Sequence, residues 1–239
     1  MKKWQKRLLI ILAAFVVLIA GGLGYLKTQM YAPNRAATTA AKASVTTDYG
    51  MLFKAKKAVG PTVIFYPGAL VAPASYSVWA KEVAAAGYPV AIVQFPLNLA
   101  VLRGNQAAKV TTSAQGYVIG GHSLGGVMAS RYAAAHASSK LRGVYFMASY
   151  PDKKGALRKT DLPVLSLTAS RDGVLEWDKW REAKQYLPAS AQFAQFAGGN
   201  HAGFGSYGAQ KGDKKATTSN AAQQHWVATR MIRWLRQLK

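Results

Sequence analysis

A serine stands between two glycines in the segment Gly121-His122-Ser123-Leu124-Gly125, where an apolar stretch typical of a buried strand changes to a helical pattern. On so tight a turn the serine stands clear of the sheet, and glycines two residues before and after it remove side chains that would collide with the strand or the helix. The amide of Leu124, at the start of the helix, would face an oxygen that becomes negative during acyl transfer. The spacing therefore predicts that Ser123 is a nucleophile and that the Leu124 amide is an oxyanion-hole donor.

A serine nucleophile needs a base, and the base needs an acid to orient it. The chain has only nine acidic residues. Asp172 directly follows the apolar stretch 162–169, at the carboxyl edge of the predicted sheet, where open α/β sheets place functional residues. Glu176 and Asp178 are fallback candidates, but they belong to the helix that is predicted to follow. We therefore expect Asp172 to be the acid.

Four histidines could supply the base. His201 lies in the loop between the last predicted strand and the closing helix. His122 is inside the serine turn and cannot easily reach its neighbour's hydroxyl, His136 ends a helix, and His225 belongs to the last helix. We expect His201 to be the base, which gives the chain order serine, acid, histidine, one of the orders known for such triads.

Composition narrows the remaining chemistry. The chain has 239 residues and no cysteine, which excludes disulfides, thiolate metal ligands and a cysteine nucleophile. Its histidines form no HxxxH or HExxH pair, so we expect neither a metal nor a cofactor. The formal net charge of +22 attracts polyanions such as anionic lipid or acidic envelope polymers, but no nucleic-acid-binding motif accompanies it. A solvated, lysine-rich surface explains the charge more simply than specific polyanion binding, and both interpretations stay open.

The N-terminal sequence predicts a membrane anchor. A basic stub, residues 1–7, precedes an uncharged and mostly apolar run over residues 8–26, whose helix would rise about 28 Å, close to the hydrocarbon thickness of a bilayer. The four basic residues of the stub should stay cytoplasmic, so a single-pass protein of the cell membrane would hold the remainder of the chain on the extracytoplasmic side. The alternative is a cleaved signal peptide, but no small-x-small site ends the run. Residues 27–44 are polar and aperiodic, as in a tether.

Residues 45–239 alternate strand and helix patterns, which predicts one α/β domain with a mostly parallel sheet and helices on both faces. A weak edge-strand pattern lies within residues 45–53, and the apolar loop 95–102 either lines an acyl pocket or is plain core. Strands are expected at 62–68, 88–95, 116–121, 141–148, 162–169 and 191–197, and helices at 77–87, from the serine turn to about 136, and at 220–238.

These features resemble those of the α/β-hydrolase superfamily, and the likeness is closest to compact bacterial members related to dienelactone hydrolases. The segments YPGALV, GGHSLGG, SRDG and GGNHAGFGSYG carry it. The resemblance implies a Ser123–His201–Asp172 triad in which Ser123 forms an acyl-enzyme that water resolves. It also implies a second oxyanion donor after the first strong strand. Family members often have His-Gly-x there, whereas residues 66–70 of this chain read YPGAL, and Ala69 is the expected donor.

The gap between the strands that end near residue 148 and begin near residue 162 is short. We therefore expect no sizeable lid, and an open site suited to small or polymer-borne acyl esters. The expected activity is that of a membrane-anchored serine hydrolase of the carboxylesterase type. The alternatives are acyl transfer or peptidase chemistry with the same triad, and a non-catalytic module that binds envelope polyanions. A binding module would need neither the serine turn nor an aspartate and a histidine in ordered loops, which favours catalysis.

Overall fold

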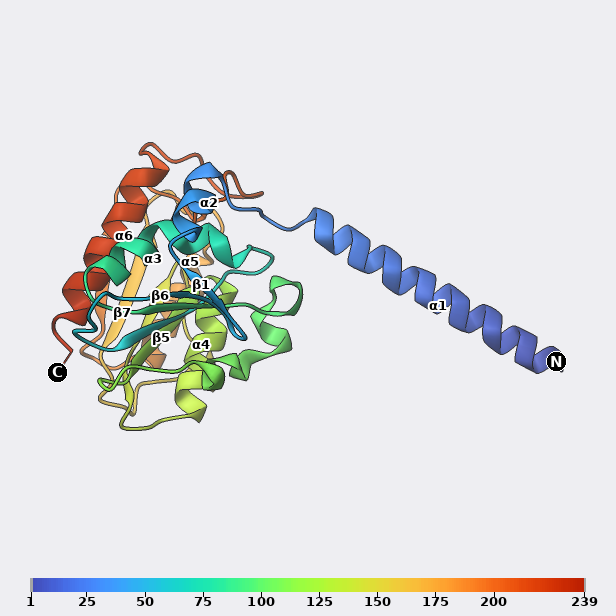
Figure 1. Ribbon diagram of the computed structural model, residues 1–239, viewed down its shortest axis with the longest axis horizontal. Helices are drawn as coiled ribbons and strands as arrows, with labels where there is room; N and C mark the ends of the chain where they lie inside the picture. The colour runs from blue at the N-terminus through green and yellow to red at the C-terminus, as the bar shows by residue number, and fades with distance from the viewer. Residues whose placement is uncertain (1, 239) are drawn as a thin grey trace. The chain divides into compact units, whose positions relative to one another are not determined.

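The structure, a computed structural model, describes residues 2–238. The chain forms two compact units that divide between Met30 and Tyr31. Within residues 2–30 there is one helix, α1 (Lys3–Thr28), and the remaining elements belong to the second unit (Figure 1). α1 is long and apolar enough to cross a membrane, with a mean hydropathy of 2.6 over an 18-residue window, although a signal sequence would meet the same test.

The second unit is built around one sheet. Its strands in residues 31–238 are β1 (Val45–Thr47), β2 (Gly50–Phe53), β3 (Thr62–Tyr66), β4 (Val90–Val93), β5 (Tyr117–His122), β6 (Leu141–Met147), β7 (Val164–Ala169) and β8 (Gln192–Phe196). They lie in the order β1-β2-β4-β3-β5-β6-β7-β8. The pairings from β4 to β8 are parallel, whereas β2 pairs antiparallel with both β1 and β4. The predicted, mostly parallel sheet is confirmed, and the weak pattern within residues 45–53 forms an antiparallel hairpin at its edge.

Helices cover both faces of the sheet (Figure 1). They are α2 (Arg35–Ala41), α3 (Ser77–Ala85), α4 (Leu124–Ala135), α5 (Trp177–Ala183) and α6 (Asn220–Leu235). Successive residues of a strand point to opposite faces, so β3 contributes Phe65 to the core beneath α3 and α6 and Tyr66 to the core beneath α4. The predicted closing helix is confirmed as α6, and its apolar face buries Val227, Met231 and Trp234.

The connections to the sheet are mostly short. Between β6 and β7 the chain forms one 3-10 turn, η5 (Lys153–Gly155). This segment is described throughout and contains no other helix. The apolar loop 95–102 buries Phe95 and Ala100 and exposes Val101 and Leu102. Of the two interpretations of this loop, the structure favours core at its buried positions, since none of its residues lines the cavity beside Ser123.

The tether predicted over residues 27–44 differs from the structure. α1 continues to Thr28, and Tyr31 already pairs with the second unit. The Tyr31 amide donates to the Leu70 carbonyl at 2.9 Å, and its carbonyl accepts from the Ala72 amide at 3.0 Å. The folded domain therefore begins at Tyr31 rather than at residue 45.

The alanine-rich part of that segment forms the helix α2. The side chain of Asn34 caps the helix by accepting from the Ala37 amide at 3.0 Å. Ala37 and Ala40 are buried, and α2 packs against α3. Small side chains give a weak hydrophobic period but allow close helix packing, which is why composition alone does not predict α2.

Candidate active site

Ser123 occupies a strained turn between β5 and α4. Its backbone has φ 51° and ψ −125°, values that residues other than glycine rarely adopt. The Ser123 amide donates to the Met147 carbonyl at 3.0 Å, and the Ser149 hydroxyl donates to the Ser123 carbonyl at 2.6 Å. Neighbouring β6 and the loop that follows it therefore hold the strained conformation in place.

The glycines around Ser123 are required by close approach of backbone. A Cβ atom on Gly125 would overlap the carbonyl oxygens of Tyr66 and Pro67 at the end of β3. A Cβ atom on Gly121 would overlap the Tyr66 carbonyl and the first turn of α4. The clash that the sequence predicts at both positions is confirmed, and the carbonyls at the end of β3 are its main source.

Asp172 and His201 form a buried pair at the carboxyl ends of β7 and β8. His201 Nδ1 lies 2.9 Å from Asp172 Oδ2, and both side chains are almost fully buried. The other carboxylate oxygen accepts from the amides of Val174 and Leu175 at 2.9 and 2.7 Å. An unprotonated carboxylate only accepts hydrogen bonds, so the proton of the neutral imidazole is on Nδ1 and Nε2 has a free lone pair.

A cavity of about 220 Å³ brings the predicted site residues together. Ser123, Leu124 and His201 all line it. His201 Nε2 is buried and has no hydrogen-bond partner in the described chain, so no bond joins it to Ser123 in this structure. Such bonds often shorten only when substrate binds. The fallback acid Glu176 lies at the same cavity, whereas Asp178 forms a surface ion pair with Arg181.

Asp213 is a residue of this site that sequence analysis missed. Its Oδ1 accepts from the Gly173 amide and its Oδ2 from the Ala202 amide, both at 2.9 Å. Gly173 follows Asp172 and Ala202 follows His201, so one carboxylate joins the loop of the acid to the loop of the base. In the sequence it stands in the basic turn GDKK, where an aspartate is unremarkable.

The two amides predicted to be oxyanion donors make no hydrogen bond within residues 2–238. Leu124 begins α4, whose first N–H groups have no acceptor within the helix. In the loop after β3, Gly68 and Leu70 donate hydrogen bonds at 3.0 and 2.9 Å. The amide of Ala69 between them makes no hydrogen bond to any residue in the range 2–238. Among the amides of residues 68–70, that of Ala69 is therefore the one free to bind another group, and its role as an oxyanion donor stays a prediction.

His122 contacts Tyr76 beneath the serine turn. Its Nδ1 lies 2.9 Å from the Tyr76 hydroxyl, which also accepts from the Gly68 amide at 3.0 Å. Burial, and then the repulsion that a protonated His122 would have with a protonated His201, hold the pKa of His122 well below 6.5. The rings of His122 and His201 are 4.4 Å apart between centroids. The contact links the loop that carries Ala69 to the serine turn through buried side chains.

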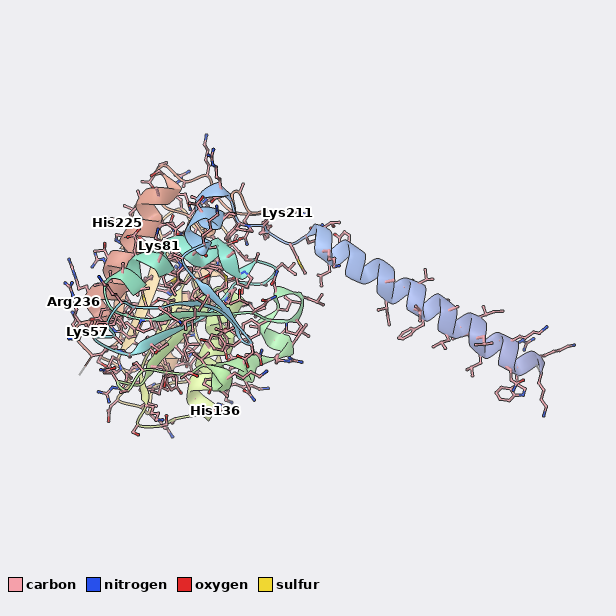
Figure 2. All side chains as sticks on the ribbon, in the orientation of Figure 1. Lys57, Lys81, His136, Lys211, His225 and Arg236 are labelled. Carbon is pink, nitrogen blue, oxygen red and sulfur yellow. The ribbon has the colours of Figure 1, made fainter. Side chains whose placement is uncertain are left out.

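The other histidines lie away from the cavity. His136 and His225 are on the surface of the second unit (Figure 2), and His225 pairs with Glu82 at 2.9 Å. Basic side chains are spread over the domain, with Lys57 and Lys211 at different sides in Figure 2. Among residues 2–238, no group of three or more His, Asp or Glu side chains is arranged to hold a metal ion.

Three solved structures share the fold of this chain. The esterase domain of a Rhodothermus marinus protein matches with a TM-score of 0.58 and 12% identity over 82% of this chain and 97% of that one. A dienelactone hydrolase from Anabaena variabilis matches with a TM-score of 0.56 and 16% identity, over 82% and 95%. The esterase Est2 from Thermogutta terrifontis matches with a TM-score of 0.54 and 13% identity, over 79% and 88%. At such low identities these likenesses show the fold alone.

The sequence comparison is more specific. No curated protein sequence matches the chain. The alpha/beta hydrolase family matches it over residues 62–225, which is more than half of its length and includes Ser123, Asp172 and His201. This protein therefore belongs to the alpha/beta hydrolase family.

Proposed function

We propose that this protein is a carboxylic ester hydrolase with Ser123 as nucleophile, His201 as general base and acid, and Asp172 as the residue that orients the imidazole. The observation that carries the proposal is the buried His201–Asp172 pair, because His201 lines the same cavity as Ser123 and its Nε2 has no hydrogen-bond partner in residues 2–238. Catalysis by an activated serine needs a serine nucleophile, a histidine with one free ring nitrogen and a carboxylate that binds the other nitrogen.

In the first half of the reaction, Ser123 Oγ attacks the carbonyl carbon of the ester and gives its proton to His201 Nε2. The amides of Leu124 and Ala69 donate to the resulting oxyanion, which is where preorganised donors lower the barrier most. The C–O bond to the leaving group then breaks, and the leaving alkoxide takes the proton from Nε2. The product of this half is an alcohol and an acyl-Ser123 ester.

In the second half, His201 Nε2 takes a proton from water, and the hydroxide attacks the acyl carbon. The bond from that carbon to Ser123 Oγ breaks, and the oxygen recovers its proton from the imidazole. No helix is inserted between β6 and β7 to cover the cavity, so water can reach the acyl-enzyme. Hydrolysis is therefore the reaction class that we favour over transfer to another acceptor.

Turnover of short acyl esters tests this proposal. Ser123→Ala should reduce kcat by several orders of magnitude, because removal of a triad member leaves only binding and oxyanion stabilisation. Ser139→Ala is a matched control, since Ser139 is exposed on the surface. Equal turnover by the two variants would reject Ser123 as nucleophile, and a folded wild type without activity on any ester would reject the hydrolase proposal.

We further propose that α1 anchors the protein in the cell membrane with the hydrolase domain outside the cytoplasm. The proposal rests on the apolar composition of α1 and on the basic residues that precede it. Protease added to intact cells should remove the domain and spare cytosolic proteins. N-terminal sequencing of the membrane-bound protein should find α1 retained. Survival of the domain until cell lysis would contradict the orientation, and a mature chain that begins after α1 would favour a signal sequence.

A further inference from the structure

The catalytic cavity has an apolar wall and one charged side chain. Val127 from α4 and Val174 and Leu175 from the segment after β7 supply apolar surface beside Ser123. Glu176 is the one ionisable carboxylate among the described lining residues, and no lysine or arginine lines the cavity. In a chain with 31 basic and 9 acidic residues, the charge presented to a bound acyl group is thus opposite in sign to the charge of the protein.

The size of the cavity limits the acyl group. Its volume is about 220 Å³, which is roughly the volume that seven molecules occupy in liquid water. Typical pockets for drug-sized ligands are larger, from about 300 Å³ upwards. A short acyl group therefore fits, and a substituent on the carbon next to its carbonyl cannot lie far from the lining side chains.

Glu176 is the N-cap residue of α5 and contacts one residue of that helix and one residue of the loop after β6. Its Oε2 accepts from the Tyr150 hydroxyl at 2.8 Å, and its Oε1 lies 2.6 Å from Lys179 Nζ. Tyr150 lines the same cavity from the loop after β6. The hydrogen bonds from Lys179 and then Tyr150 lower the pKa of Glu176, so the carboxylate is ionised at neutral pH.

We propose that the preferred substrates are esters of small α-amino acids, with Glu176 as the residue that binds the ammonium group of the acyl part. The inference rests on the hydrolase function proposed above. A carboxylate has about four acceptor sites on its two oxygens, and the contacts to Tyr150 and Lys179 use two of them. A substrate ammonium can occupy a third without removing either contact.

Two charges could oppose this binding, and neither does so strongly. The ion pair of Glu176 with Lys179 is exposed, and exposed pairs of this kind contribute little stability, so Lys179 yields readily to another cation. The net charge of the protein acts over longer distances, and salt at physiological ionic strength screens it beyond about 8 Å. A carboxylate in hydrogen-bond contact with the substrate therefore dominates the local field.

The test uses two substrates of the same shape. Alanine ethyl ester carries an ammonium group where isobutyric acid ethyl ester carries a methyl group. The intrinsic reactivities of the two esters are the same for every variant, so the change in the ratio of their kcat/KM values between variants isolates the interaction with Glu176. We expect wild type to prefer the alanine ester by about tenfold, the effect of one hydrogen bond to a charged group. The ratio should fall as the pH rises through the pKa of the substrate amine, because the neutral amine loses the attraction.

Two variants on the same helix provide the comparison. Glu176→Gln should lower the ratio of the two kcat/KM values and so remove most of the preference for the alanine ester. Asp178→Asn is the matched control. Asp178 pairs with Arg181 three residues later, as Glu176 pairs with Lys179, but Asp178 does not line the cavity. The Asp178→Asn variant should keep the preference in full.

The outcomes separate this inference from the proposed function. If wild type hydrolyses the two esters with equal kcat/KM values in a Ser123-dependent reaction, the hydrolase function stands and the role of Glu176 is rejected. The role is rejected equally if Glu176→Gln and Asp178→Asn change the ratio alike. If neither ester, nor any other short ester, is hydrolysed by folded wild type, both the function and the inference fall.

Discussion

The turn that carries Ser123 and the two loops that carry Asp172 and His201 keep their shapes by different means. The turn depends on the absence of side chains, since Gly121 and Gly125 let backbone from β3 approach it closely. The loops depend on polar side chains, because the carboxylates of Asp172 and Asp213 accept from loop amides. Close backbone packing, with one hydrogen bond to β6 and one from the loop after it, holds Ser123, whereas hydrogen bonds to carboxylates hold the loops of Asp172 and His201.

This difference has a consequence for mutation. A new side chain at the serine turn must displace backbone, so stability and activity should fall together. A lost hydrogen bond in the loops leaves the sheet and both cores intact, so activity should fall with a smaller change in stability. Four experiments test this distinction, in decreasing order of expected effect.

Asp172→Asn should have the largest effect on turnover. The amide oxygen can still accept from Val174 and Leu175, so the loop keeps its shape and the melting temperature should change little. The amide nitrogen favours the wrong tautomer of His201, and kcat should fall by about 10⁴-fold, as such substitutions do in serine hydrolases. Steady-state kinetics and thermal unfolding check this, with Asp161→Asn on the surface as the control. Loss of less than tenfold would show that Asp172 is not the orienting acid.

Gly125→Ala should reduce both activity and stability. Its methyl group would overlap the Tyr66 and Pro67 carbonyls, and relief requires a shift of the turn. We expect a loss of about 100-fold in kcat/KM from misplacement of Ser123 and of about 2–3 kcal/mol in the free energy of unfolding. Gly104→Ala is the control, since a Cβ there meets only the flexible end of Met128. If the two variants behave alike, sterics do not fix the turn.

Asp213→Asn should have an intermediate effect. One of its two acceptors becomes an NH₂ group that faces a backbone N–H of either Gly173 or Ala202, which loosens the link between the two loops. We expect kcat to fall by about tenfold, with KM and the melting temperature less affected. Asp213→Glu keeps the charge but lengthens the side chain. A role through charge alone would preserve kcat in this variant, whereas the hydrogen-bonded link predicts that kcat falls there as well. Unchanged kcat in Asp213→Asn would show that the link does not position the acid and the base.

The smallest effect concerns pH. His122 is neutral in the folded protein because burial holds its pKa well below 6.5, whereas in the unfolded chain it binds a proton below that pH. Unfolding therefore takes up a proton, and stability should fall as pH falls from about 6.5, with a slope of at most ~1.4 kcal/mol per pH unit. Denaturant unfolding between pH 7 and 5 measures this slope. His136→Gln on the surface should keep it, and a flat profile would contradict the burial of a neutral His122.

Much of the fold follows from local sequence patterns. Strands buried on both faces are short apolar runs, and the glycine-flanked serine fixes one strand and one helix around it. The order of Ser123, Asp172 and His201 along the chain, each after a predicted strand, was sufficient to predict that these residues meet at one edge of the sheet. The buried pair of Asp172 and His201 agrees with that prediction.

Other features depend on contacts that no local pattern records. Asp213 is 40 residues from Gly173 and 11 from Ala202, so its two hydrogen bonds exist only after the sheet has formed. α2 has few large apolar residues, and its burial comes from packing on α3. Tyr76 reaches His122 across 46 residues. These are tertiary contacts of ordinary residue types, and sequence period cannot distinguish them from solvated turns and linkers.

The position of a covalent adduct tests the central claim most directly. A fluorophosphonate reacts only with a serine that a neighbouring base activates, and peptide mass spectrometry locates the modified residue. We predict one adduct, on Ser123, that forms at least 10³-fold more slowly in His201→Ala and at the wild-type rate in His225→Ala, whose ring is exposed on α6. An adduct on another serine, or labelling of Ser123 at the same rate in all three proteins, would contradict the account.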